Sequence, residues 1–203
     1  MLIILGLCVQ KAYSEQLSGD ASKQYPHVYE DRIVFVDFRN GNADIYLYNI
    51  TSQIEYPICT NKSTQLKPAL YKDKIVWQDL RDGSGYANII MFDLGNGSER
   101  VISNATRSQE EPKIFDSFIV WTDYRSQTSN GDIYCYNLSN STEVQITCNT
   151  ALQAEPDIYK TKIVWTDTRY DEDGDIFICD LNTGVETQLT TSTLGQYHPK
   201  IYG

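Results

Sequence analysis

The sequence predicts an all-β repeat protein, and three observations carry this prediction. Aromatic residues make up 12% of the 203 residues, fifteen of them Tyr, and this composition favours strands over helices. No window shows the i, i+3, i+4, i+7 apolar spacing of an amphipathic helix, which excludes helical repeats of similar length. Five prolines recur at separations of 42, 44, 44 and 43 residues, namely Pro26, Pro68, Pro112, Pro156 and Pro199.

Each repeat is expected to contain four short antiparallel strands. The first begins at the repeated proline, as in residues 156–159, and the fourth is mostly polar, as in residues 185–189. The second strand recurs as IVFVDFR (33–39), IVWQDLR (75–81), IVWTDYR (119–125) and IVWTDTR (163–169). The third recurs as DIYLYNI (44–50), NIIMFDL (88–94), DIYCYNL (132–138) and DIFICDL (175–181). The spacing of these segments predicts one four-stranded sheet for every repeat.

The connections between the strands carry turn residues, not helices. Asn-Gly or Asp-Gly pairs follow the second strand at residues 40–41, 82–83, 130–131 and 173–174, and such pairs favour tight hairpins. The second strand is apolar on both faces, so it needs a sheet packed on each side. Blades stacked around an axis meet this need, and a β-propeller is therefore predicted.

The chain is expected to form one domain behind an exported N-terminus. Residues 1–14 resemble a signal peptide, because an apolar run precedes Ala12 and Ser14, which suit cleavage after Ser14. The run is short and no Lys or Arg precedes it, so a strand-forming or disordered tail is the alternative. Residues 15–23 are assigned to a linker and 24–203 to the repeats. The blades are placed at 24–65, 66–108, 109–152 and 153–195, with a partial fifth blade at 196–203.

The repeat unit, P-x-I-Y followed by IVW-x-D-x-R and DIY-x-Y-N/D-L, resembles the TolB-like β-propeller repeats. It is most similar to the version found in surface proteins of methanogenic archaea, and the likeness covers residues 24–203. Two departures are Phe35 in place of the repeated Trp and Asn88-Ile89-Ile90 in place of Asp-Ile-Tyr. The resemblance implies a propeller fold and more blades than four, but it leaves the function open because propellers bind, scaffold and hydrolyse.

A charged motif recurs at the end of each second strand. An active site breaks the symmetry of a repeat, so these residues are expected to be structural, with Asp accepting turn N–H groups and Arg capping or pairing across neighbouring blades. A ring of ligand-binding or catalytic charges is the alternative. The tryptophans are expected to be wedges between blades. The motif comprises Asp37, Arg39, Asp79, Arg81, Asp123, Arg125, Asp167 and Arg169, with Trp77, Trp121 and Trp165.

Six Asn-x-Ser/Thr sequons are present, roughly three times the number expected by chance for this composition. Glycosylation is predicted, although the turn preferences of Asn and Ser explain part of the excess. Four of the six lie near the turn between the third and fourth strands, so sugars would crowd one face of the disc. The sequons are Asn49, Asn61, Asn96, Asn104, Asn137 and Asn140.

No cofactor, metal or catalytic group is predicted. The acidic turn 171–175 has the oxygen density of a calcium loop but lacks the distal Glu of an EF-hand, so a solvated turn is favoured. His27 and His198 flank prolines in equivalent strands, and no G-x-S-x-G motif is present. Cys59, Cys135, Cys148 and Cys179 occupy four different registers of the repeat, and they are expected to be buried free thiols. Cys8 lies in the signal segment.

The net charge of −10 argues against nucleic acids and anionic membranes as partners. Nothing after Val9 approaches the length of a membrane span. The favoured function is a non-catalytic binding or scaffolding module of a secreted or cell-surface protein, associated with the surface layer, whose partner is a protein or a surface glycan. The alternative is the gating propeller of a TolB-like or peptidase-type hydrolase whose catalytic domain lies outside this chain.

The count of strands predicts that the array does not close. Residues 199–202 repeat an inner strand that the first unit already has. The four repeats are therefore expected to form an open, aggregation-prone arc or a dimer that pools blades from two copies, and a closed ring of four blades is the alternative. In an array that does not close, the apolar flanks would include Ile33 and Phe35 at one end and Ile163 and Trp165 at the other.

Overall fold

The computed structural model describes residues 22–126 and 130–203, and this part of the chain forms four antiparallel sheets of four strands each. The first sheet comprises β1 (Lys23–Tyr29), β2 (Arg32–Asp37), β3 (Asp44–Asn49) and β4 (Ile54–Cys59). The second comprises β5 (Gln65–Tyr71), β6 (Lys74–Asp79), β7 (Asn88–Asp93) and β8 (Ser98–Ser103). The third comprises β9 (Gln109–Phe115), β10 (Phe118–Asp123), β11 (Asp132–Asn137) and β12 (Thr142–Gln145). The fourth comprises β13 (Gln153–Tyr159), β14 (Lys162–Asp167), β15 (Asp175–Asp180) and β16 (Val185–Gln188).

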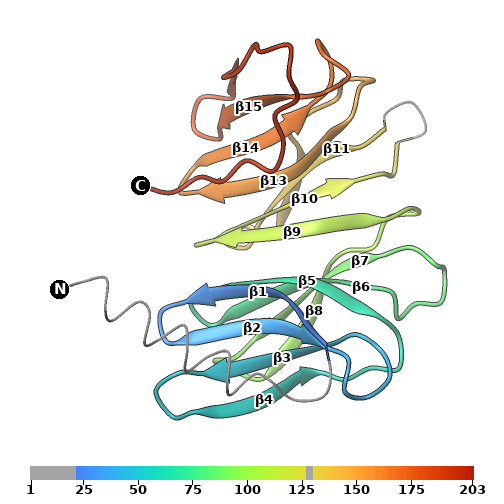
Figure 1. Ribbon diagram of the computed structural model, residues 1–203, viewed down its shortest axis with the longest axis vertical. Helices are drawn as coiled ribbons and strands as arrows, with labels where there is room; N and C mark the ends of the chain where they lie inside the picture. Colours follow the sequence, from blue (N-terminus) through green and yellow to red (C-terminus); the bar gives the residue numbers. More distant parts are fainter. Residues whose placement is uncertain (1–21, 127–129) are drawn as a thin grey trace.

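Each sheet is one sequence repeat with its strands in chain order, so the predicted blades are confirmed (Figure 1). The signal segment 1–14, with Cys8, lies outside the described residues, as does most of the linker. The described residues contain no helix long and apolar enough to cross a membrane.

The inner strands begin three residues earlier than the sequence indicated, and each carries a β-bulge before its proline. The pairing of β13 with β14, for example, shifts register between Ala154 and Asp157. The residue before each proline has a left-handed φ, between 52° and 59°, in Tyr25, Lys67, Glu111 and Glu155, and also in His198. A bulge bends the strand and redirects one side chain. These bulges lie along the axis of the array.

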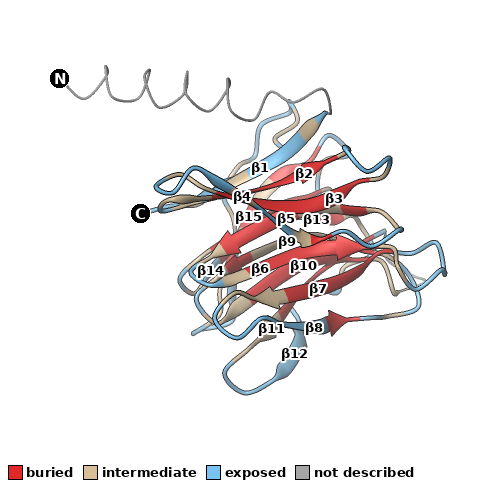
Figure 2. Cartoon of the chain, turned by 90° about the horizontal axis from the view of Figure 1, so that it is seen from below, coloured by how far each residue is buried: buried red, intermediate tan, exposed pale blue. Residues whose placement is uncertain are grey.

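Neighbouring blades pack face to face through their second and third strands. Side chains alternate along a strand, so one face of each blade meets the preceding blade and the other meets the following one. Val34 and Ile45 of the first blade pack on Trp77 of the second, and the next two interfaces repeat this arrangement. The rings of Trp77, Trp121 and Trp165 are fully buried. Figure 2 shows burial concentrated in the middle strands and exposure in outer strands such as β4 and β12.

A repeated glutamine at the start of the inner strands links each blade to the preceding one. The backbone N–H of Gln65 donates to the carbonyl of Ala43 at 2.9 Å, and Gln109 and Gln153 form the equivalent bonds. All three side chains are fully buried. No motif in the sequence indicated a role for this position.

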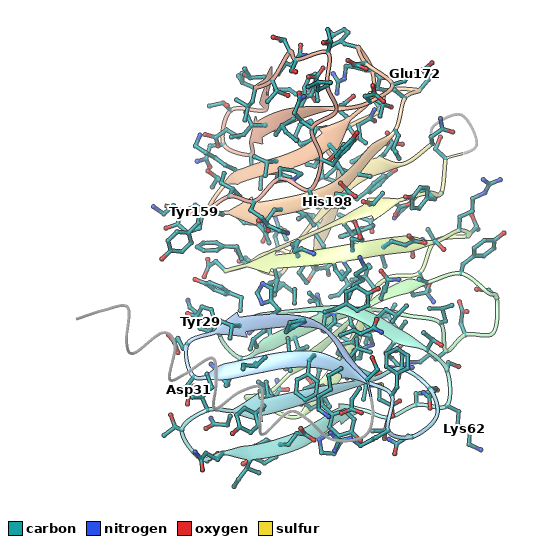
Figure 3. All side chains as sticks on the ribbon, in the orientation of Figure 1. Tyr29, Asp31, Lys62, Tyr159, Glu172 and His198 are labelled. Atoms are coloured by element: carbon teal, nitrogen blue, oxygen red, sulfur yellow. The ribbon has the colours of Figure 1, made fainter. Side chains whose placement is uncertain are left out.

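A row of aromatic rings joins the opposite ends of the inner strands. The ring centroids are 4.9 Å apart between Tyr29 and Tyr71, 4.6 Å between Tyr71 and Phe115, and 4.8 Å between Phe115 and Tyr159. Tyr202 extends the row at 5.5 Å from Tyr159. Tyr29 and Tyr159 lie at the same edge of the array in Figure 3. This row ties all the inner strands together on one face.

The array is an open arc, with the first and fourth blades at opposite ends of its long axis (Figure 1). Residues 196–203 lie against the fourth blade as an inner strand would. Gln196 N–H donates to the Gly174 carbonyl at 2.9 Å, and Ile201 N–H donates to Asp157 Oδ2 at 3.1 Å. The segment pairs with no strand of the described residues, so the expected inner strand at 199–202 forms no ladder.

The open flanks differ from those expected. Ile163 and Trp165 are fully buried against the third blade, because the Trp face of every blade points toward the preceding one. The outward flank of the fourth blade instead carries Ile176 and Ile178, which are half-buried, whereas the equivalent Ile133 is fully buried.

At the other end, Ile33 and Phe35 do belong to the outward face of the first blade. They form a separate buried cluster with Tyr46 and Tyr48. The Lys23 ammonium lies 5.9 Å from the Phe35 ring centroid, and the Arg39 guanidinium lies 4.2 Å from that of Tyr46. Cationic groups therefore cover part of this flank.

We predict that the 203-residue chain associates in a concentration-dependent way through the flank of the fourth blade, because apolar surface there lacks a packed neighbour. Static light scattering should show a mass that rises with concentration. Ile178→Lys should reduce this association. Val144→Lys, at an exposed position on the outer strand β12, is the matched control and should leave it unchanged. A compact monomer at every concentration would contradict the prediction.

Candidate functional site

The inner strands surround an axial pocket of about 470 Å³. Its wall is formed by residues 25–27 of β1, 67–68 of β5, 111 and 113 of β9, 155–156 of β13, and residues 198 and 200. Most of these residues lie at or next to the bulges. The pocket is therefore built by the one irregular feature that all the inner strands share.

The bulges are held by side chains of the preceding blade. Glu111 N–H donates to Gln78 Oε1 at 3.0 Å, and Glu155 N–H donates to Thr122 Oγ1 at 3.1 Å. Gln78 and Thr122 occupy the variable position of the IVWxD strand. The first blade has Val36 there, whose side chain cannot accept a hydrogen bond. A position that looked variable in the sequence therefore determines how the neighbouring bulge is anchored.

Both carboxylates that line the pocket are paired with cationic groups or donors. Glu111 Oε1 lies 2.7 Å from Lys67 Nζ, and that ammonium also lies 4.6 Å from the centroid of the Tyr25 ring. Glu155 Oε1 lies 2.8 Å from His198 Nδ1. Its second oxygen accepts hydrogen bonds from the His198 backbone and the Thr166 hydroxyl, each at 3.0 Å. The carboxylates thus serve as structural links between inner segments.

Two lysines of the pocket lack such a partner. No ion pair of Lys113 or Lys200 is present among residues 22–126 and 130–203, and Lys113 Nζ donates only to the Pro112 carbonyl at 3.3 Å. Burial, followed by repulsion from Lys200, lowers the pKa of Lys113 to about 8. The charges of Glu111 and Asp157 oppose this decrease only in part, and neither carboxylate forms an ion pair with Lys113.

His27 occupies the same side of the pocket in its neutral form. Its Nδ1 accepts a hydrogen bond from the Leu70 backbone N–H at 3.2 Å, which joins β1 to β5. Burial, and then the charge of Lys113, lower its pKa to about 4. Protonation at Nδ1 would break the hydrogen bond from Leu70 N–H. The hydrogen bond and the lowered pKa therefore both indicate a neutral imidazole.

The repeated Asp residues of the sequence motif lie outside the pocket, fully buried at the ends of β2, β6, β10 and β14. Each accepts a hydrogen bond from the backbone N–H of the Arg two residues later, at 2.8 to 3.0 Å. In three blades the Trp indole also donates to this Asp, for example from Trp121 to Asp123 at 2.9 Å. Phe35 has no such donor, and the ammonium of Lys23 binds Asp37 at 2.9 Å instead.

Each Arg of the motif pairs mainly within its own blade, which corrects the expected pairing across blades. Arg125 binds Asp123 at 2.5 Å and Glu143 of the fourth strand at 2.6 Å. The pairs Arg39–Glu55, Arg81–Glu99 and Arg169–Glu186 are equivalent. Contacts to the preceding blade are secondary, from Arg81 to Cys59 Sγ and from Arg125 to Ser103 Oγ. The guanidinium thus connects the end of the second strand to the outer strand.

The sequons fall on both faces of the array. Asn49, Asn96, Asn137 and Asn140 lie at or next to the turns that join third and fourth strands, whereas Asn61 and Asn104 lie in connections between blades. Asn49 is half-buried, and its amide group donates to Asp31 Oδ2 at 3.0 Å and accepts from Ser52 N–H at 2.7 Å. Asn61, Asn96, Asn104 and Asn140 are exposed.

The remaining candidates form no cluster. In the acidic turn, Asp173 N–H donates to Asp171 Oδ1 at 2.9 Å, and the described residues contain no group of three potential metal ligands. Cys59, Cys135 and Cys179 are buried and free. Cys148 is exposed, contrary to expectation, because it follows β12 in the connection to the next blade.

We predict that Asp123→Ala lowers the free energy of unfolding by about 2 to 4 kcal/mol, because buried donors from Trp121 and Arg125 lose their acceptor. Thermal or urea unfolding measures this. Glu172→Ala, at an exposed position of the acidic turn, is the control and should change stability by less than about 0.5 kcal/mol. Unchanged stability combined with loss of a binding activity would show that the motif serves a ligand.

We also predict acid sensitivity that depends on His27. Its pKa in the folded state, about 4, lies below the ordinary value of 6.5, so the unfolded chain takes up the proton first as the pH falls. The free energy of unfolding should therefore decrease by up to about 3 kcal/mol between pH 6.5 and pH 4. His27→Asn retains an acceptor for Leu70 and removes this titration. Unfolding curves of both proteins at several pH values test this, and equal acid sensitivity would refute it.

Comparison with known proteins supports the fold. No family model and no curated protein matches the sequence. TolB from Acinetobacter baumannii is similar, with a TM-score of 0.70 over 90% of this chain and 47% of TolB, at 18% identity. The β-propeller domain of the Trilobed protease from Pyrococcus furiosus has a TM-score of 0.62 over 84% of this chain and 57% of that one, at 14% identity. A puromycin-hydrolyzing peptidase of Mycobacterium tuberculosis has a TM-score of 0.64 over 84% of this chain and 29% of that one, at 12% identity. The chain thus spans about half the length of TolB and has the fold of a TolB-like β-propeller.

Proposed function

We propose that the chain is a non-catalytic binding module of a secreted or cell-surface protein, and that it binds its ligand in the axial pocket. The observation that carries this proposal is the convergence of four bulged inner strands and the terminal segment 196–203 on one pocket, each with a left-handed residue before its proline. A non-glycine residue with positive φ is uncommon, and strained backbone of this kind clusters at ligand sites. The four repeats and the terminal segment each have it at the residue before the proline.

The size and lining of the pocket suit a small ligand. Ligand sites are usually clefts of about 300 to 1,000 Å³ with apolar walls and a few convergent polar groups. The rings of Pro26, Pro68 and Pro156 contribute the apolar surface here, and lysines and histidines contribute the polar groups. No Ser, Thr or Cys is among the residues that line the pocket. The wall therefore contains groups that can bind a ligand, but no hydroxyl or thiol nucleophile of these residue types.

A second function is favoured by the likeness to peptidase structures. The chain would then be the propeller portion of a hydrolase, and the axial pocket would be part of a passage toward a separate catalytic domain. The coding sequence on both sides of this segment distinguishes the two functions. A hydrolase domain there supports the second, and further blades or adhesive modules support the first.

Binding itself is tested by a nuclear magnetic resonance screen of neutral sugars, sugar acids, amino acids and dipeptides. The proposal expects ligands whose shift changes centre on residues 25–27, 67–68, 111–113, 155–157 and 198–200. Ligands that bind only elsewhere, or turnover of any compound, would refute it. The chain with Lys72→Met, changed at an exposed position outside the pocket, serves as the control.

We predict export and glycosylation in the native host. Intact-mass analysis should show cleavage after Ser14 and added sugar. Asn61, Asn96, Asn104 and Asn140 should carry more sugar than Asn49, because the amide group of Asn49 is held by Asp31 and Ser52. An uncleaved N-terminus without any glycan would contradict the surface location.

A further inference from the structure

We propose that the axial pocket binds the carboxylate group of a small ligand between Lys113 and Lys200. This inference rests on the proposed binding function and names the chemistry of the ligand. Lys113 comes from β9 and Lys200 from the terminal segment 196–203, and both side chains line the pocket.

The charges of the pocket are divided into a paired set and an unpaired set. Lys67 Nζ forms an ion pair with Glu111 at 2.7 Å, and His198 Nδ1 lies 2.8 Å from Glu155 Oε1. Lys113 and Lys200 form none with the described residues, although Glu111 and Asp157 are close enough to influence Lys113. Asp157 is itself engaged by the Ile201 backbone, whose N–H donates to Oδ2 at 3.1 Å. Glu111 is thus paired with Lys67, and Asp157 keeps a negative charge near Lys113 without forming an ion pair with it.

Lys113 is half-buried and Lys200 is exposed, and placing the first near the second without an ion-pair partner opposes folding. A half-buried ammonium loses hydration, and a second ammonium nearby adds repulsion. The lowered pKa of Lys113 has these two causes in that order. Protein sites that are costly for the empty fold are often sites that a ligand stabilises. An anion between the two lysines would remove the repulsion and restore the lost hydrogen bonds.

Several features favour a carboxylate over a phosphate. Phosphate sites typically use Arg forks or clustered backbone N–H groups, and no Arg lines this pocket. Glu111 and Glu155 keep two negative charges in the same wall, which disfavours a dianion more than a monoanion. The proline rings and Tyr25 provide apolar surface for the body of the ligand. A sugar acid or a short peptide with a free carboxylate matches this combination.

The charge of the site depends on pH because several titratable side chains surround Lys113. The groups that face Lys113 are His27 on β1, Lys67 on β5, Glu111 on β9, Asp157 on β13 and Lys200. His27 stays neutral near pH 7 because its pKa is about 4. Lys113, with a pKa of about 8, is the cation of this group that loses its proton first as the pH rises above neutral. Affinity for a carboxylate should therefore decrease between pH 7 and pH 9.

The test uses calorimetric titration of the full chain with acetate, succinate and D-glucuronate, and with D-glucose and inorganic phosphate for comparison. We expect the carboxylates to bind at millimolar or lower concentration and D-glucose to bind at least tenfold more weakly than D-glucuronate. Lys113→Met and Lys200→Met should each weaken carboxylate binding about tenfold or more, since each removes a charged hydrogen-bond donor. Lys72→Met should leave it unchanged. Affinity should fall from pH 7 to pH 9 in the wild type but not in Lys113→Met.

The melting temperature of the chain without ligand tests the charge repulsion in the pocket and does not depend on which ligand is chosen. Without ligand, Lys113→Met should raise the melting temperature by about 2 to 4 °C, because it removes an unfavourable charge from the pocket. Carboxylates that do not bind, phosphate that binds more tightly than D-glucuronate, or a Lys113→Met chain with unchanged affinity would each overturn the inference. If neutral compounds still bind in the pocket, the proposed binding function stands and only the carboxylate assignment fails. If no compound of the wider screen binds there, the binding function fails as well.

Discussion

The packing of blade on blade is the constraint on which the rest of the structure depends. The second strand of every repeat is apolar on both faces, so a single sheet cannot bury it. Trp77, Trp121 and Trp165 are fully buried because each faces the preceding blade, where small and branched side chains such as Val34 and Ile45 receive the ring. Each buried Trp then needs an acceptor for its indole N–H, and the Asp two residues later provides it. Burial of the Trp ring and hydrogen bonding of its indole N–H are thus coupled within one short segment.

Two blades lack one of the aromatic residues of this segment, and in each of them a nearby side chain makes the missing contact. The first blade has Phe35, which donates no hydrogen bond, and Lys23 binds the buried Asp37 in place of an indole. The second blade has Ile90 where three blades have an aromatic ring under the Arg guanidinium, and there Arg81 contacts Cys59 and Glu99. Such compensations preserve the fold without creating a reactive group. The Asp and Arg residues of the motif therefore have a structural role in all four blades.

The axial pocket follows a different principle, because its prolines are repeated but its charged side chains are not. The bulge position holds Tyr25, Lys67, Glu111, Glu155 and His198 in five successive segments. The backbone there is the same in each segment, while the side chains supply different charges. Contacts between these side chains join neighbouring inner segments, and among the residues that the structure describes Lys113 and Lys200 form no ion pair. A symmetric scaffold thus carries an asymmetric site, which is how a repeat fold gains a specific ligand.

The sequence by itself determined the number of blades, the order of their strands and the burial of the tryptophans, because these depend on a pattern repeated four times. It also located the Asp and Arg residues, but not the partners of Arg, since those depend on which outer strand lies nearest in space. Only the tertiary structure decided that the residue before each proline forms a bulge and that these bulges meet at one pocket. His27, Lys113 and Lys200 each directly follow the repeated proline of their own segment, but the residue type at this position varies, so no motif indicated a shared site. Their proximity arises from the curvature of the arc, which local sequence patterns do not specify.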